Sequence, residues 1–224
     1  AKANDIGFEF SVGGYSTYIW RGFRLSEEEL QIQPSATVSF GGFSANVWAE
    51  YDSDTEEWLE VDYTAAYAHD FDGLSLELGY IHYDINDGLD SDEIYLSAGF
   101  DTVLNPSVTV YYDINEGEGA FIVAGISHPV ELGESSSLEF GASASMIVDN
   151  GYVATDANGE EFTGLFNADL TASASIALCD YASIDPMVGY TVAISDDASD
   201  AIKMSNSDGD DAFFYGGVAL TLSF

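Results

Sequence analysis

The chain of 224 residues is 46% hydrophobic, and it carries 40 acidic residues against four basic ones, a formal net charge of -36. This charge excludes nucleic acid as a partner, because almost nothing in the chain can neutralise phosphates. Intrinsic disorder is disfavoured as well, since 14 Tyr, 14 Phe and three Trp indicate extensive ordered burial. The apolar runs are far shorter than the roughly 20 residues of a membrane-spanning helix.

Apolar residues alternate with small or polar residues along the whole chain, which is typical of strands with two different faces. The first such segment begins at Ile6 and continues through Tyr18 and Trp20, and the last runs from Phe214 to Phe224. We predict twelve strands, in residues 6–20, 30–40, 43–51, 59–67, 74–80, 94–100, 108–112, 122–126, 138–146, 168–176, 184–194 and 214–224.

The connections between these segments alternate between short and long. Short turns are expected at 41–42, 71–73, 101–105 and 177–180, with a somewhat longer one at 129–135. The long connections are acidic, and 25 of the 40 Asp and Glu residues lie in 27–29, 52–57, 84–93, 113–118, 149–161 and 196–211. Acid is therefore concentrated at one end of the predicted sheet.

An even number of antiparallel strands of about ten residues, with short turns at one end and long loops at the other, is the pattern of an outer-membrane barrel. We predict an all-β fold, a 12-stranded antiparallel transmembrane up-and-down β-barrel that forms a single domain over residues 1–224. The long acidic loops would be extracellular, and both termini periplasmic. The alternative is a soluble β-sandwich, whose outer face would need many more charged residues.

Aromatic residues near both ends of the segments fit two interfacial belts. One belt would comprise Phe8, Phe40, Phe43, Phe71, Phe100 and Phe224, and the other Tyr18, Trp20, Tyr51, Tyr80, Tyr112 and Phe214.

Alternation also predicts which charged residues face the barrel interior. The acidic residues expected there include Glu50, Glu60, Asp62, Glu77, Asp169 and Asp185. With Tyr18 and Trp20 facing lipid, Arg21 would point inward near the outer rim and pair with carboxylates such as Glu50, Glu60 or Asp62.

Twelve strands leave room for a narrow aqueous path, and carboxylates along it would favour cations. We therefore predict a monomeric channel for passive diffusion of small solutes, with a preference for cations. The alternative is a closed barrel with a structural, adhesion or partner-binding role through its acidic loops.

Two loop stretches offer hard oxygen ligands of the kind that Ca²⁺ prefers. They contain Asp87, Asp90 and Asp92, and Asp208, Asp210 and Asp211. Neither matches a twelve-residue EF-hand loop, so we expect diffuse bridging by divalent cations, including bridging to lipopolysaccharide, rather than a required cofactor.

Catalysis is not expected. His69 and His82 fall near predicted strand ends and His128 in a predicted turn, and the chain contains no Gly-x-Ser-x-Gly sequence. Cys179 is the only cysteine, which excludes an intrachain disulfide.

Residues 18–23, Tyr-Ile-Trp-Arg-Gly-Phe, precede an acidic stretch and the Gln-Ile-Gln-Pro segment at 31–34. This arrangement resembles the TorF-type family of outer-membrane porins, whose signature at this place is similar to Tyr-Val-Trp-Arg-Gly. The resemblance implies an outer-membrane location and a porin role. The terminal Phe224 is similar to the C-terminal signal that the outer-membrane barrel assembly machinery recognises, which implies that machinery as a partner.

Overall fold

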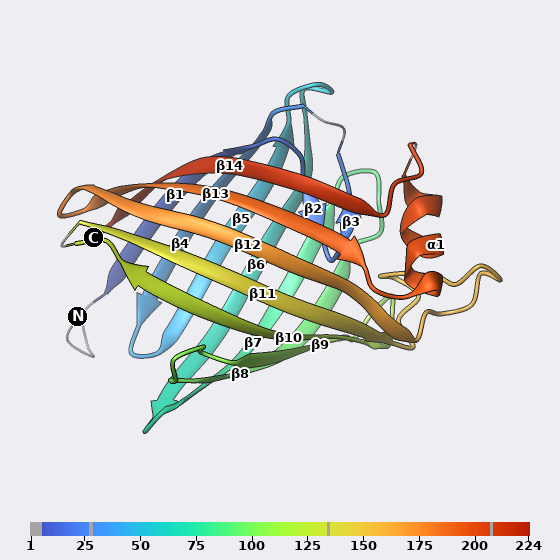
Figure 1. The fold of residues 1–224 in the computed structure, drawn as a ribbon, viewed down its shortest axis with the longest axis horizontal. Helices are drawn as coiled ribbons and strands as arrows, with labels where there is room; N and C mark the ends of the chain where they lie inside the picture. Colours follow the sequence, from blue (N-terminus) through green and yellow to red (C-terminus); the bar gives the residue numbers. More distant parts are fainter. Residues whose placement is uncertain (1–5, 27–28, 134, 207) are drawn as a thin grey trace.

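The computed structural model describes residues 6–26, 29–133, 135–206 and 208–224. The wall strands in these ranges are β1 (Gly7–Tyr15), β4 (Gln31–Phe40), β5 (Phe43–Asp52), β6 (Glu57–Phe71), β7 (Leu74–Ile85), β8 (Ser91–Phe100), β9 (Ser107–Asp113), β10 (Ala120–Glu131), β11 (Ser136–Val148), β12 (Gly164–Cys179), β13 (Ala182–Ala193) and β14 (Ala212–Ser223). They form a closed antiparallel barrel in which β14 pairs with β1 (Figure 1). The 12-stranded transmembrane up-and-down barrel is confirmed. Residues 27 and 28 of the first acidic stretch lie outside the described ranges.

The outer surface of the wall is apolar, the reverse of a soluble sheet. Phe10 and Val12 of β1 are 46% and 47% exposed, and Val188 of β13 is 62% exposed, although each lies within a strand. Such a surface is stable against acyl chains, where the closed sheet leaves no backbone group without a partner. The β-sandwich alternative is excluded, because the sheet closes on itself.

The two ends of the barrel differ. We call the end with the short connections, where β1 begins and β14 ends, the turn end, and the opposite end, which bears the long connections, the loop end (Figure 1). The backbone of Phe224 exchanges two hydrogen bonds with that of Phe8, at 3.1 and 2.9 Å, so the last residue completes the seam of the barrel. The predicted belt at the turn end is exposed at every position: Phe8, Phe40, Phe43, Phe71, Phe100 and Phe224.

Tyrosine rings cover part of the inner wall, and each lies against a glycine of the neighbouring strand. Tyr95 pairs with Gly79, and Tyr215 with Gly189. A Cβ atom at Gly79 would lie 2.3 Å from the Tyr95 ring, and one at Gly189 would lie 2.2 Å from that of Tyr215. The rings can lie flat on the wall only because their partners have no side chain.

The predicted first strand is too long, because β1 ends at Tyr15 and the chain then turns into the barrel. A small hairpin follows, with β2 (Ile19–Trp20) paired to β3 (Phe23–Arg24). The two residues between them, Arg21 and Gly22, have φ values of 51° and 88°. Two consecutive positive φ angles are typical of a type I′ turn, which suits a two-residue hairpin. Tyr18 is only 7% exposed, so the prediction that this segment faces lipid is wrong.

The last long connection contains the helix α1 (Asp196–Ser205), which the alternation analysis did not predict. Ser195 caps it by accepting a hydrogen bond from the backbone N–H of Ala198 at 3.1 Å. Acidic residues in its first turn and Lys203 in its last turn suit the helix dipole. Among the described residues, no helix is long and apolar enough to cross a membrane.

Candidate functional site in the barrel lumen

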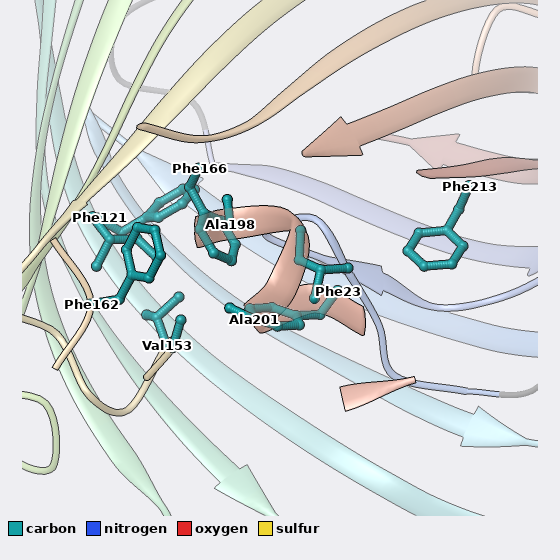
Figure 2. Packing of buried hydrophobic residues seen from close by; sticks show 11 residues of the cluster. Phe23, Phe121, Val153, Phe162, Phe166, Ala198, Ala201 and Phe213 are labelled. Carbon is teal, nitrogen blue, oxygen red and sulfur yellow. The ribbon is translucent and has the colours of Figure 1, made fainter. Parts of the chain in front are cut away.

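An apolar core lies at the loop end of the barrel. We call the parts of the connections that contribute to it, which are the hairpin β2–β3, residues 150–163 and α1, the plug. Figure 2 shows their side chains packed against inward-facing residues of the wall. The buried members are Phe23, Phe121, Ile147, Val153, Ala154, Phe162, Phe166, Ala198, Ala201, Ile202 and Phe213.

Phe166 lies at the centre of this core. Its ring centroid is 5.2 Å from that of Phe23 in the hairpin and 5.2 Å from that of Phe162. A bulge in β12 opposite β11 gives the strand one extra residue here, so Phe166 and Asn167 are both buried while Leu165 faces outward. The bulge therefore directs two consecutive side chains toward the plug, which strict alternation cannot do.

Gly22 lets the hairpin approach this wall. A Cβ atom at Gly22 would lie 2.8 Å from Cβ of Asn167, and the φ of 88° also favours glycine. Asn167 is fixed in turn, because its side-chain amide donates to Asp169 at 2.9 Å and to Thr191 at 3.1 Å.

Arg21, at the tip of the hairpin, reaches across the lumen to β8. Its guanidinium donates two hydrogen bonds to the Glu93 carboxylate, at 2.7 and 2.6 Å, and the two side chains are 7% and 1% exposed. The guanidinium carbon also lies 4.6 Å from the ring centre of Trp20, 4.9 Å from that of Tyr111 and 4.5 Å from that of Phe121. This is a bidentate pair inside an aromatic box, the strongest way for a protein to hold a guanidinium.

The structure places Arg21 inside the barrel and pairs it with Glu93 instead of the expected carboxylates. Glu93 takes the place of Glu50, Glu60 or Asp62 because the hairpin crosses the lumen instead of continuing β1. The sequence contained a signal for Glu93, since alternation from the outward-facing Ile94 places it on the inner face.

Three predicted carboxylates lie together on β5 and β6. Glu50 and Glu60 are directly paired across the two strands, and Asp62 lies two residues further along the same face. The hydroxyl of Tyr18 donates to Glu60 at 2.8 Å. Both carboxylate oxygens of Glu50 and one of Asp62 are buried, with no hydrogen-bond partner among the described residues. Negative charge at these positions is thus not offset by a direct ion pair.

The other predicted lumen carboxylates are spread along the barrel, each within reach of hydroxyl or amide donors. Glu77 accepts from Tyr95 at 2.7 Å. Asp169 accepts from Asn167, and Asp185 accepts from Ser175 at 2.7 Å. The predicted site residues therefore do not meet at one point. They form an acidic lining that is densest beside the plug.

The acidic loops are partly held by basic residues. Arg24 donates to Asp208, and Lys203 lies 3.1 Å from Asp211. The hydrogen bond from Arg24 lowers the pKa of Asp208. Hydrogen bonds from Ser199 and Lys203 lower that of Asp211.

In the loop stretch that contains Asp87, Asp90 and Asp92, two carboxylates contact other groups. Asp90 accepts from the backbone N–H of Ile85 at 3.1 Å, and Asp92 contacts Nδ1 of His82 at 2.9 Å. Asp87, in the turn between Ile85 and Asp90, has a positive φ of 56°. No group of three His, Cys, Asp or Glu side chains in the described part of the chain is arranged to hold a metal ion. Calcium binding by the two predicted stretches stays a prediction.

A cavity of about 440 Å³ lies between the hairpin and the wall formed by β6 and β7. Its lining includes Tyr18, Trp20, Tyr83, Tyr152 and Glu60. Burial raises the pKa of Tyr152, which lies in the loop 149–163, to about 12, so its phenol is neutral at ordinary pH. The lining of the cavity is thus mostly aromatic and aliphatic, with one carboxylate.

Comparison with known proteins agrees with the barrel architecture. No protein-family model and no curated protein matches the chain. Among solved structures, a NanC porin superposes with a TM-score of 0.59 at 12% identity, over 96% of this chain and 98% of that one. An outer-membrane channel from Pseudomonas putida F1 gives 0.55 at 10% identity, over 98% and 94%. The resemblance to TorF-type porins stays a prediction, and the chain has the fold shared by these outer-membrane porins and channels.

Proposed function

We propose that the protein is an outer-membrane channel for passive diffusion of small solutes and that it prefers cations. The observation that carries this proposal is the charge of the lumen. Glu50, Glu60 and Asp62 line one wall, whereas the basic side chain at their level, Arg21, is neutralised by Glu93. A lining with net negative charge attracts cations and repels anions.

The proposed setting is the bacterial outer membrane, with the loop end outside the cell and both termini in the periplasm. The short connections at the turn end and the long acidic ones at the loop end support this orientation. In this setting the barrel assembly machinery would bind the C-terminal strand through Phe224, and divalent cations would bridge the acidic loops to lipopolysaccharide. We further propose that the barrel acts as a monomer.

The plug favours a second candidate, a closed barrel with a structural, adhesion or partner-binding role through its loops. Its apolar core joins the hairpin, residues 150–163 and α1 to the inner wall. A channel with this plug must conduct around it or when the hairpin leaves, whereas a closed barrel needs neither.

Conductance in planar lipid bilayers separates the two candidates. The channel is expected to conduct and to reverse, in a KCl gradient, at a potential of the same sign as the potassium equilibrium potential. A combined Glu50→Gln, Glu60→Gln and Asp62→Asn variant should move the reversal potential toward zero, and Asp72→Asn, in an exposed turn at the other end, should leave it unchanged. No conductance at any voltage, or a preference for anions, would refute the channel.

A further inference from the structure

The cavity between the hairpin and the β6–β7 wall has the size and lining of a ligand site. At about 440 Å³ it lies within the range of small-molecule pockets. The rings of Tyr83 and Tyr152 stand nearly perpendicular to that of Trp20, at interplanar angles of 81° and 88° and centroid distances of 6.3 and 6.4 Å. Rings at right angles present faces in more than one direction, which is how aromatic cages surround a cation.

Glu60 gives this cavity its charge. It accepts a hydrogen bond from Tyr18 at 2.8 Å and shares a second with Asp62, and a carboxylate has about four lone-pair positions. Glu60 therefore keeps acceptor capacity for a ligand that donates. Its cross-strand neighbour Glu50 is fully buried with both oxygens unpaired, and Asp62 has one unpaired oxygen, so further acceptor positions lie beside Glu60.

The basic side chain that follows Trp20 in the hairpin is already committed. Arg21 forms its bidentate pair with Glu93 and lies over the ring of Trp20 at 4.6 Å. One nitrogen cation is thus already held by an aromatic ring that lines the cavity and by a carboxylate of the neighbouring strand β8. The cavity offers the same two groups, aromatic rings and a carboxylate, which is here Glu60.

We propose that this cavity binds a small primary alkylammonium ion, with the ammonium donating to Glu60 and the alkyl body lying among Tyr18, Trp20, Tyr83 and Tyr152. The aromatic and aliphatic lining suits an ion with an apolar body better than a metal ion. Free acceptor positions on Glu60 suit an ammonium with N–H groups better than a quaternary one. The inference deepens the proposed function and rests on it for a physiological role, although binding itself does not require conduction.

Titration calorimetry on the refolded protein in detergent at low ionic strength tests the proposal with n-butylammonium as the probe. We expect saturable binding, at least about tenfold weaker binding of neutral 1-butanol, and weaker binding of tetramethylammonium. Glu60→Gln should weaken n-butylammonium binding at least about tenfold, because it removes the charge and keeps the shape. Tyr152→Leu should weaken it several-fold, and Asp72→Asn should not change it, with the fold of each variant checked by circular dichroism.

Three results would overturn the site: no saturable binding of n-butylammonium, equal binding of 1-butanol, or an unchanged affinity in a folded Glu60→Gln variant. Tetramethylammonium binding as tightly as n-butylammonium would overturn the assignment to a primary amine. Conductance of the same preparation keeps the two proposals apart. Binding without conductance refutes the channel and leaves the site, whereas conductance without binding refutes the site and leaves the channel.

Discussion

Replacing Arg21 by Met should release the hairpin from the wall. The substitution removes both hydrogen bonds to Glu93 and the contacts with three rings, and it leaves a carboxylate that is 1% exposed without a counter-ion. Breaking a buried ion pair by removing one partner costs about 3–5 kcal/mol. At about 1.4 kcal/mol for each factor of ten, the ratio of docked to undocked hairpin should fall by roughly two to three and a half orders of magnitude.

Two measurements detect the release of the hairpin in the Arg21→Met variant. Hydrogen exchange of the backbone amides in Ile19–Arg24 reports undocking, and single-channel recording reports whether undocking opens the lumen. A double variant with Arg21→Met and Glu93→Leu should recover most of the protection, because no buried charge is left without a partner. If Arg21→Met exchanges as slowly as the parent protein and conducts equally, the pair does not hold the hairpin and the reasoning fails.

Three further predictions concern the wall, the loops and assembly. Gly189→Val should destabilise the barrel by about 1–3 kcal/mol in urea unfolding, because the new Cβ would lie 2.2 Å from the ring of Tyr215; unchanged stability would show that the ring moves freely. Because the hydrogen bond from Arg24 lowers the pKa of Asp208, the contribution of this pair to stability is present above the unfolded carboxyl pKa and is lost as the pH falls through the lower folded value. The protection factor of the backbone amides at this contact, which is the intrinsic exchange rate at each pH divided by the measured rate, should thus be steady from neutral pH down to the ordinary Asp pKa of 3.8 and fall below it, and a fall at a higher pH would contradict the assignment. Deleting Phe224 should slow insertion into vesicles that contain the assembly machinery, and an unchanged rate would remove its role as a signal.

The alternation of apolar and polar residues predicts the wall strands, because almost every strand of a barrel in lipid has one face toward the lipid and one toward the interior. Phe10 and Val12 face outward as their positions in the pattern require, and the short turns fall at one end. The same rule failed at Tyr18 and Trp20, where aromatic residues continue the pattern although the backbone has left the sheet. The signal for that departure is Gly22 at the second position of a two-residue turn, and it is weak in a chain with 22 glycines.

The candidate site was predicted less well than the wall. Its inward carboxylates follow from alternation, but Phe166 and Asn167 face inward together only because of a bulge, and bulges leave no period in the sequence. The pairing of Arg21 with Glu93 joins residues that are 72 positions apart. Such a contact depends on where a loop folds in three dimensions, which no local pattern records. Alternation does not predict helix α1, because its acidic first turn lies in a long acidic connection and its Ser195 cap leaves no period in the sequence.

The places in the sequence from which the apolar core is drawn set an order for folding. Phe23 belongs to the hairpin, whereas Phe166 and Phe213 belong to β12 and β14, near the other end of the chain. Contacts this distant in sequence form late, after the cost of closing long loops has been met. The apolar core is therefore incomplete until the last strands have joined the barrel. Burial of Phe23 should coincide with the pairing of β14 with β1, which closes the barrel. Trp20 lies beside this core, so its fluorescence would report the moment at which the cylinder becomes complete.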